Sequence, residues 1–459
     1  MKIKAFIDSH LHLMGMGYYE EILNLNNAKS LAEIIELAKK SENEVIIGRG
    51  FNQDNLLEKR MPEAQDFQEI EKPMVLFRIC GHVAVANRSM IDLIKEKLDI
   101  LPVSGGSFDL KTGLFTENAL AYLYQALPKP TKKDLVRYIA KANKILLKNG
   151  ITKVASDDFS SFDVPFEMVI EAYQEAIEQG LLDVEVTEQV NLPIKKLEDF
   201  CRKGFANKKY QNFQMGPLKV LADGSLGGRT AAMNEPYSDD LHNLGILTYT
   251  DSELYDLIKL ATINQMDSVI HAIGDRAADQ VIDALIKVQE EMNVKSPNNA
   301  IIHAQVLNRN QIEKMKNHQI GAIVQPVFIN SDIQIVKDRL GERKDESYLF
   351  KTMYENIPLG FSTDCPVEAV NPFKNIYCSI TRKSADKPEF DAFLSEEGFT
   401  LKEALKAYTD NNLRYVYSES QDDYLEIDRD IFRVENEELL SVRVLKTYKN
   451  GKIVYERKN

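Results

Sequence analysis

The chain has 459 residues, of which 44% are hydrophobic and 28% charged, a balance typical of a soluble globular protein with a large core. Its net charge of −13 excludes nucleic acid or an anionic membrane surface as the main partner, because both carry dense negative charge. The four cysteines form no CxxC pair and the N-terminus has no signal-peptide core, so we expect a cytoplasmic protein with reduced thiols.

Eight short apolar runs alternate with amphipathic segments along the chain, and none approaches the roughly 20 residues that cross a bilayer. The runs typical of buried strands are residues 4–9, 150–156, 182–190, 216–222, 267–273, 300–305, 320–327 and 357–363. Helical patterns lie between most of them, and several end in Gly or Asn before the next run. This alternation predicts an α/β fold, a (β/α)8 TIM barrel over residues 5–415.

Two stretches depart from the repeat. Residues from about 44 to 130 separate the first two predicted strands and contain two further strand-like runs, 44–51 and 73–82, so we expect an inserted subdomain after strand 1. Residues 439–456 alternate around Asn450-Gly451, a pair typical of a two-residue hairpin turn.

Side chains that bind metals follow several of the predicted strands. His10 and His12 are two residues apart at the end of the first strand, so they face the same side. His271 and His303 end the fifth and sixth strands, and Asp364 follows the eighth. Because a barrel gathers the carboxyl ends of its strands at one face, these residues predict a metal centre there. Imidazole and carboxylate suit zinc, and also manganese or iron.

Lys219 lies within the apolar fourth strand, where an unpaired ammonium is costly. One interpretation is that the lysine side chain reaches solvent or pairs with Asp223. The other is carbamylation by carbon dioxide, which turns the amine into a carboxylate able to bridge two metal ions. Two ions could share a hydroxide that attacks a carbonyl, while Asp364 accepts the water proton and passes it to the leaving amine. Asp8 is expected to orient one of the ligands.

The chain resembles the amidohydrolase superfamily over roughly residues 5–415, and more narrowly its amidohydrolase-3 branch, the N-substituted formamide deformylase-like metal-dependent hydrolases. The resemblance rests on the motifs FIDSHLH, GRGFNQD, RICGHVAVAN, LADGSLGGRTA, HAIGDRAADQ, IIHAQV and STDCPVEAVNPF. The fourth and fifth together are specific to this branch.

The resemblance implies two divalent metal ions bridged by a carbamylated lysine. The implied ligands are His10, His12 and Asp364 for one ion, His271 and His303 for the other, and Lys219 as the bridge. His82 would face the substrate and stabilise the developing oxyanion, or else support the inserted subdomain.

Four further residues are weaker candidates for the wall of the substrate pocket: Gln53, Arg78, Asp223 and Arg229. Arg229 follows a Gly-Gly pair, and it would either meet an anionic group of the substrate or pair with Asp239.

Members of the family usually carry a β-sandwich before and after the barrel, whereas here only four residues precede Ala5. We therefore expect a reduced β-sandwich remnant formed by residues 1–4 and 416–459. An exposed strand edge in this remnant would allow a homodimer.

Taken together, the residues and the resemblance predict a metal-dependent hydrolase that cleaves the C–N bond of a small amide through a metal-bridged hydroxide. Three alternatives stay open: a single-metal deaminase on the same barrel, a hydrolase of esters or phosphoesters, and a non-catalytic binding protein that has kept the barrel.

Overall fold

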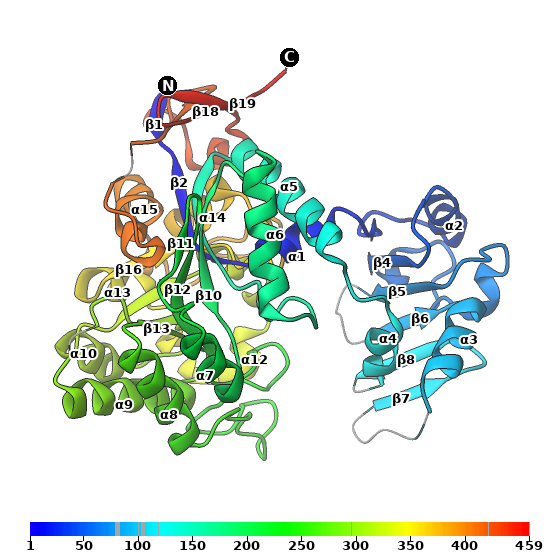
Figure 1. The fold of residues 1–459 in the computed structure, drawn as a ribbon, viewed down its shortest axis with the longest axis horizontal. Helices are drawn as coiled ribbons and strands as arrows, with labels where there is room; N and C mark the ends of the chain where they lie inside the picture. Colours follow the sequence, from blue (N-terminus) through cyan, green and yellow to red (C-terminus); the bar gives the residue numbers. More distant parts are fainter. Residues whose placement is uncertain are drawn as a thin grey trace. The chain divides into compact units, whose positions relative to one another are not determined.

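The computed structural model describes residues 1–78, 83–99, 101, 106–117, 119–294, 296–420 and 422–458. The chain divides into two compact units, one made of Met1–Gly17 and Lys132–Asn459, the other of Tyr18–Thr131 (Figure 1). The sequence placed the start of the insertion near residue 44, whereas the smaller unit begins at Tyr18 and includes helix α2 (Leu31–Lys39). Among the described residues, no helix combines the length and apolar character needed to cross a membrane.

The larger unit contains a parallel barrel of eight strands, as the sequence predicted. In barrel order they are β2 (Phe6–Leu11), β9 (Ile151–Ser156), β10 (Glu185–Val190), β12 (Phe213–Leu221), β13 (Ser268–Ala272), β14 (Ala300–His303), β15 (Gly321–Val324) and β16 (Leu359–Phe361). Beyond the end of β16 the chain meets β2 again: Asp364 N donates to the His10 oxygen at 2.9 Å, and His12 N donates to the Cys365 oxygen at 2.8 Å. These bonds bring the ligand-bearing ends of the first and last strands together.

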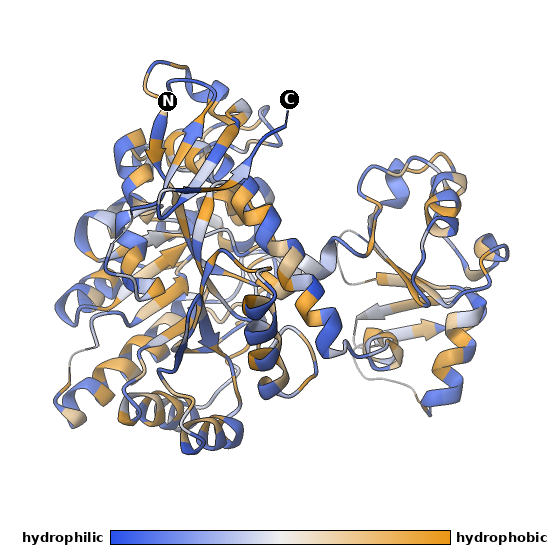
Figure 2. Cartoon of the chain, turned by 45° about the horizontal axis from the view of Figure 1, so that its top comes forward, coloured by the Kyte–Doolittle hydropathy of each residue, from blue (hydrophilic) through white to orange (hydrophobic). Residues whose placement is uncertain are grey.

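Helices cover the outside of the barrel with one apolar face each. They are α5 (Lys132–Lys148), α6 (Phe166–Glu178), α7 (Ile194–Arg202), α8 (Asp251–Ile263), α9 (Asp275–Met292), α10 (Arg309–Asn317), α13 (Phe350–Asn356), α14 (Pro372–Thr381) and α15 (Leu401–Ala407). In α5 the buried Leu135, Ile139, Ala142 and Leu146 recur every three or four residues, the spacing of one helix face. Figure 2 shows the resulting pattern, with apolar strands inside and polar helix faces outside.

The chain ends form one small antiparallel sheet in the order β1 (Lys2–Lys4), β17 (Tyr424–Ile427), β18 (Val444–Lys449) and β19 (Lys452–Glu456). The predicted hairpin turn is confirmed, since Asn450 and Gly451 both have positive φ, 50° and 76°, as a type I′ turn requires. Thr447 Oγ1 donates to the Leu147 oxygen at 2.7 Å and so ties this sheet to α5. The sheet is the reduced terminal β segment expected from the sequence.

The smaller unit has a sheet and a core of its own. Its strands, in sheet order, are β3 (Leu23–Asn24), β4 (Ile46–Phe51), β5 (Met74–Arg78), β6 (Val83–Ala86), β8 (Leu114–Glu117) and β7 (Gly106–Asp109). Along β5, Met74 and Leu76 join one apolar cluster and Val75 and Phe77 join another, so the sheet is covered on both faces. Helices α3 (Arg88–Lys97) and α4 (Leu120–Ala126) contribute to the second cluster.

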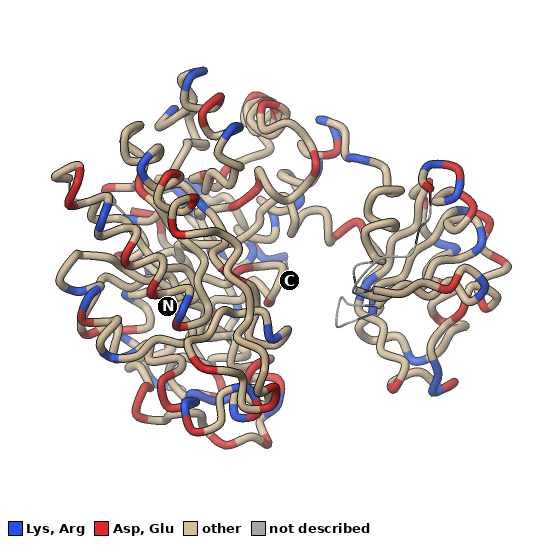
Figure 3. The backbone as a smooth tube through the Cα atoms, turned by 90° about the horizontal axis from the view of Figure 1, so that it is seen from below, with Lys and Arg blue, Asp and Glu red and all other residues tan. Residues whose placement is uncertain are grey.

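Charged residues of both signs are interspersed over the outer segments of each unit (Figure 3). This pattern is the ordinary solvated surface of a globular protein.

Candidate metal centre

Three of the predicted ligands meet where β2 and β16 end. The Nε2 atoms of His10 and His12 each lie 3.3 Å from Asp364 Oδ1. The ligand atoms of these three residues lie within 4.8 Å of one another, and within the described ranges they form the one such group of His, Cys, Asp or Glu side chains. His10 and Asp364 are buried, while His12 is 26% exposed, so the group has one side open to solvent.

Asp8 forms hydrogen bonds to the backbone of the segments that carry these ligands. Its Oδ1 accepts from the backbone N–H of His10 at 3.3 Å and of Thr363 at 3.1 Å, and its Oδ2 accepts from Thr363 Oγ1 at 2.6 Å. Burial raises the pKa of Asp8 to about 7 despite these hydrogen bonds. Asp8 therefore joins β2 to the segment after β16, and its contact with His10 is made through the backbone N–H of that ligand.

The donor set at Asp364 fits a divalent cation. Asp364 Oδ1 is buried and receives no hydrogen bond of adequate geometry, although two imidazoles are nearby. Burial opposes ionisation of Asp364, but those imidazoles outweigh it and hold its pKa well below the usual range. An ionised, unsatisfied carboxylate oxygen beside two imidazole nitrogens is the ligand chemistry of zinc, with room for a further ligand on the open side.

His271 and His303 form a second pair beside this group. Their ring centroids are 4.5 Å apart, and the His303 ring lies 5.8 Å from that of His10. Burial holds the pKa of His303 well below its ordinary value, so its imidazole stays neutral and able to act as a ligand. The Nε2 of His271 faces the Gly224 carbonyl oxygen at 3.0 Å, so Nδ1 is the ring nitrogen that could serve as a ligand.

Lys219 is 2% exposed on β12 and pairs with a residue that the sequence did not single out. Its Nζ lies 3.7 Å from Oδ2 of Asp157, which is 1% exposed. The sequence-based alternative of a pair with Asp223 is wrong: the ion-pair partner of Lys219 is Asp157, which follows β9, and the Asp223 oxygens accept backbone N–H groups. Burial opposes ionisation of Asp157, but the charges of Lys219 and His12 outweigh it and lower the Asp157 pKa.

Asp223 shapes the loops around His271. Its two oxygens accept backbone N–H groups of Ala232, Ile273 and Gly274 at 2.8–3.0 Å. His271 Nε2 also lies 3.3 Å from Asp223 Oδ1. Arg229 makes a two-pronged contact with Asp239, at 3.1 Å from Nε and 2.9 Å from Nη2, which is the second of the two roles that the sequence allowed.

The remaining candidates belong to the smaller unit. Arg78 Nε donates to Gln53 Oε1 at 2.7 Å, so these two polar side chains hold each other. His82 lies outside the described residues.

Three residues near the centre were missed by the sequence reading: Asp157, Gln189 and Gln325. Asp157 directly follows β9, Gln189 lies near the end of β10, and Gln325 directly follows β15. The strand-end rule that identified the histidines would have found all three. Two of the three carry amides, which are not among the common zinc ligands.

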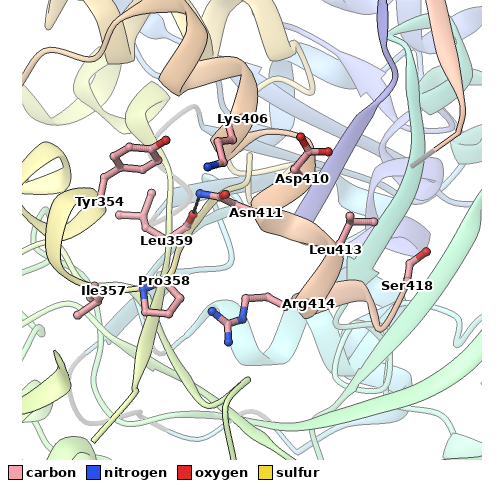
Figure 4. Close-up of a pocket in the computed structure, with 10 residues that line it drawn as sticks. All are labelled: Tyr354, Ile357, Pro358, Leu359, Lys406, Asp410, Asn411, Leu413, Arg414 and Ser418. Carbon is pink, nitrogen blue, oxygen red and sulfur yellow. Dashed lines mark hydrogen bonds between the residues drawn. The ribbon is translucent and has the colours of Figure 1, made fainter. Parts of the chain in front are cut away.

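A separate groove lies at the opposite end of β16, with a volume of about 660 Å³ (Figure 4). It is lined by Pro358 and Leu359 at the start of this strand, and by polar side chains of which several have hydrogen-bond partners. Asn411 Nδ2 donates to the Leu359 oxygen at 2.9 Å, and Arg414 Nη2 donates to the Pro297 oxygen at 2.6 Å. The predicted metal ligands His10, His12 and Asp364 gather at the other end of the strand.

Comparisons with known proteins show the family to which the chain belongs. The sequence profile of the Amidohydrolase family matches residues 5–455. The chain is 29% identical to YtcJ of Bacillus subtilis (strain 168), which carries the name of an amidohydrolase, over 99% of this chain and 88% of that protein. It is 22% identical to the N-substituted formamide deformylase of Arthrobacter pascens, over 99% of this chain and 88% of that protein.

A solved structure gives the same answer for the fold. The crystal structure of an uncharacterized metal-dependent hydrolase from Pyrococcus horikoshii OT3 shares 30% identity and a TM-score of 0.81, covering 95% of this chain and 87% of that one. The resemblance noted from the motifs is thereby confirmed. A barrel that gathers imidazole and carboxylate side chains at the ends of its strands, matched along nearly its whole length, identifies this chain as a metal-dependent hydrolase of the amidohydrolase family, in the amidohydrolase-3 branch.

Proposed function

We propose that this hydrolase cleaves the C–N bond of a small amide-type substrate. The observation that carries the proposal is the meeting of His10, His12 and Asp364 at one end of the barrel, with His271 and His303 beside them. The name of the similar N-substituted formamide deformylase supports an amide as the substrate class.

The residues present suit two divalent metal ions, with zinc as the first choice and manganese or iron as alternatives. One ion would be held by His10, His12 and Asp364, the other by His271 and His303, with carbamylated Lys219 as the bridge. When bound, the ions supply Lewis-acid activation of water and of the scissile carbonyl.

The chain's own residues would move the proton and surround the substrate. The ionised carboxylate of Asp364 would accept a proton from the attacking water and deliver it to the leaving nitrogen. His82 is proposed to donate to the developing oxyanion. Gln53 and Arg78 are proposed to contact the substrate. For Asp223 and Arg229, whose polar atoms contact other protein groups, we propose a role in shaping the pocket wall.

Metal analysis and an amide panel test this proposal. Purified protein should contain two metal equivalents and release amine from N-substituted formamides or from linear or cyclic amides. Lys219→Ala should lower the metal content, whereas Lys153→Ala, which removes another buried strand lysine (6% exposed, paired with Glu185), should not. Metal-free protein, or a metal content unchanged by Lys219→Ala, would refute the two-metal mechanism.

A single-metal deaminase is the second candidate, and one observation favours it. Within the described residues, the three-ligand group could bind one metal ion. Lys219 pairs with the carboxylate of Asp157 and not with a ligand of a second ion. One metal equivalent per chain, no carbamate signal after incubation with isotope-labelled bicarbonate, and ammonia released from an amino-substituted ring would select this candidate.

We also propose a homodimer and a cytoplasmic location. Of the described strands, β19 pairs only with β18 and carries Ile453 at 48% exposure, so its outer edge is available to a second copy. A monomer in sedimentation at micromolar concentration would refute the dimer. Cys201 and Cys378 carry free thiols, consistent with a reducing compartment.

A further inference from the structure

Two buried glutamines lie against histidines of the metal centre. Gln189 on β10 is 0% exposed, and Gln325, directly after β15, is 1% exposed. Gln189 Oε1 lies 2.6 Å from His10 Nδ1, and Gln325 Oε1 lies 2.8 Å from His303 Nδ1. Two histidines on different strands are therefore contacted in the same way, through Nδ1 and by a neutral amide.

The surroundings of each amide determine which end faces the imidazole. Gln189 Nε2 donates to the Ser9 carbonyl oxygen at 3.1 Å. Gln325 Nε2 donates to Ser362 Oγ at 2.7 Å and lies 3.4 Å from the Ile323 carbonyl oxygen. A carbonyl oxygen only accepts hydrogen bonds, so the amide nitrogen must face it and Oε1 must face the histidine.

This orientation decides where each neutral imidazole carries its proton. An amide oxygen against Nδ1 requires a proton there, so the lone pair lies on Nε2. In His10 that Nε2 is the atom 3.3 Å from Asp364 Oδ1. His12 Nδ1 also faces an acceptor, the carbonyl oxygen of Asp157 at 2.8 Å, so this ring nitrogen carries a proton as well.

We propose that Gln189 and Gln325 are positioning residues that fix the tautomer and ring orientation of His10 and His303, so that each offers an Nε2 lone pair to the metal centre. The proposal rests on the proposed function and deepens it. Neutral acceptors suit this place because Asp157 and Asp364 already bury two carboxylates there, and further buried charge would be costly.

The tautomers can be measured on the metal-free chain. The chain has seven histidines, and NMR of isotope-labelled histidine resolves protonated from bare ring nitrogens. Removing His10 and His303 one at a time assigns their signals. We expect bare Nε2 atoms at both. Gln189→Met should give a mixed tautomer at His10 alone, and Gln325→Met should do so at His303 alone. Unchanged tautomers in both variants would overturn the proposal.

Zinc affinity gives the second measurement, by competition with a chromogenic chelator. Each Met variant should bind zinc about 10–100-fold more weakly than the unmodified chain, the usual effect of losing a partner of a ligand histidine. Gln325→Glu should retain most of the affinity, because it keeps an oxygen against Nδ1 and the Ser362 hydroxyl can turn to donate. The control is Gln280→Met: Gln280 is 9% exposed on α9 and donates to the Tyr249 oxygen, away from the centre.

The outcomes separate this proposal from the proposed function. A chain that binds neither zinc nor manganese nor iron refutes the function, while the tautomers of the metal-free chain still decide the role of the glutamines. Zinc binding with unchanged tautomers refutes the glutamine role and leaves the function intact. A loss of zinc affinity in Gln280→Met equal to that in the site variants would indicate a general effect on the fold. It would also refute the role of the two glutamines. Should Gln189→Met fail to fold, the Gln325→Met and Gln325→Glu pair decides.

Discussion

At the scale of single residues, two predicted ligands adopt a backbone conformation that most residues avoid. The φ angle is 75° at His303 and 56° at Asp364, both in the left-handed region. A non-glycine residue held there costs about 1–3 kcal/mol. The strained Asp364 also carries the buried oxygen without a hydrogen-bond donor. Strain and an unsatisfied acceptor at one residue indicate a site arranged for binding rather than for stability.

The ion pair between Lys219 and Asp157 leads to the first prediction. Asp157→Asn should lower the free energy of unfolding of the metal-free protein by about 3–5 kcal/mol, because it leaves a buried ammonium without its counter-charge. Urea denaturation measures this change. The double variant Asp157→Asn with Lys219→Met should recover much of the loss. A stabilising effect of Asp157→Asn would instead mean that Lys219 carries a negative carbamate in the purified protein.

At the scale of elements, two helix ends show how the sequence terminates the helices around the barrel. After α6, Gly180 adopts φ 66°, and the Leu181 N–H reaches back to the Ala176 oxygen at 2.8 Å. After α8, Gln265 adopts φ 59°, with Met266 N–H bonded to the Ala261 oxygen at 2.9 Å. Both are Schellman ends, but only the first has the glycine that favours the left-handed position.

The matched substitutions at these ends should have opposite signs. Gly180→Ala should destabilise the protein by about 1 kcal/mol, since nothing lies within 4 Å of the added Cβ and the effect is purely conformational. Gln265→Gly should stabilise it by a similar amount, since Gln265 is exposed. Thermal unfolding measures both. Equal signs would contradict the explanation.

The elements were predicted better than the contacts between them. All eight strands were identified, because buried parallel strands appear as apolar runs whatever their neighbours. The start of the smaller unit at Tyr18 was missed, because α2 has the same amphipathic pattern as a barrel helix. The partner of Lys219 was predicted wrongly: the sequence suggested the nearest carboxylate in the chain, whereas Asp157 follows β9, two strands away in the barrel.

At the scale of the whole molecule, each unit has its own hydrophobic core, and the group of His10, His12 and Asp364 lies in the larger one. Chelation should therefore lower the unfolding temperature of the barrel and leave the transition of residues 18–131 unchanged. Restoring metal at 100 times its Kd should return about 2.7 kcal/mol of stability. Differential scanning calorimetry with and without chelator tests this, and an equal shift of both transitions would contradict it.

The attachment of the terminal sheet should depend on pH. Glu185 on β10 lies 2.9 Å from Lys153 Nζ and 3.5 Å from Lys449 Nζ on β18. Burial opposes its ionisation, but the two ammonium groups outweigh burial and lower the Glu185 pKa. Its contribution to stability is present above the unfolded pKa and is lost as the pH falls through the lower folded pKa.

Between neutral and acid pH, the Glu185→Gln variant should therefore lose less stability than the unmodified chain. Urea midpoints measured over this pH range test this. The exposed Glu198→Gln is the control and should leave the profile unchanged. A Glu185→Gln profile parallel to that of the unmodified chain would contradict the prediction.

The pairing of β2 with the end of the barrel has a consequence for how the protein is made. The Asp8 carboxylate that holds Thr363 joins residues 355 positions apart in the chain. A ribosome therefore releases the strand carrying His10 and His12 long before its last partner exists. Contacts between residues so far apart in the sequence form late. The smaller unit can therefore fold on the emerging chain before β2 has paired with its last partner. The metal centre would be among the last parts completed, and metal supplied during synthesis would find only fragments of its site.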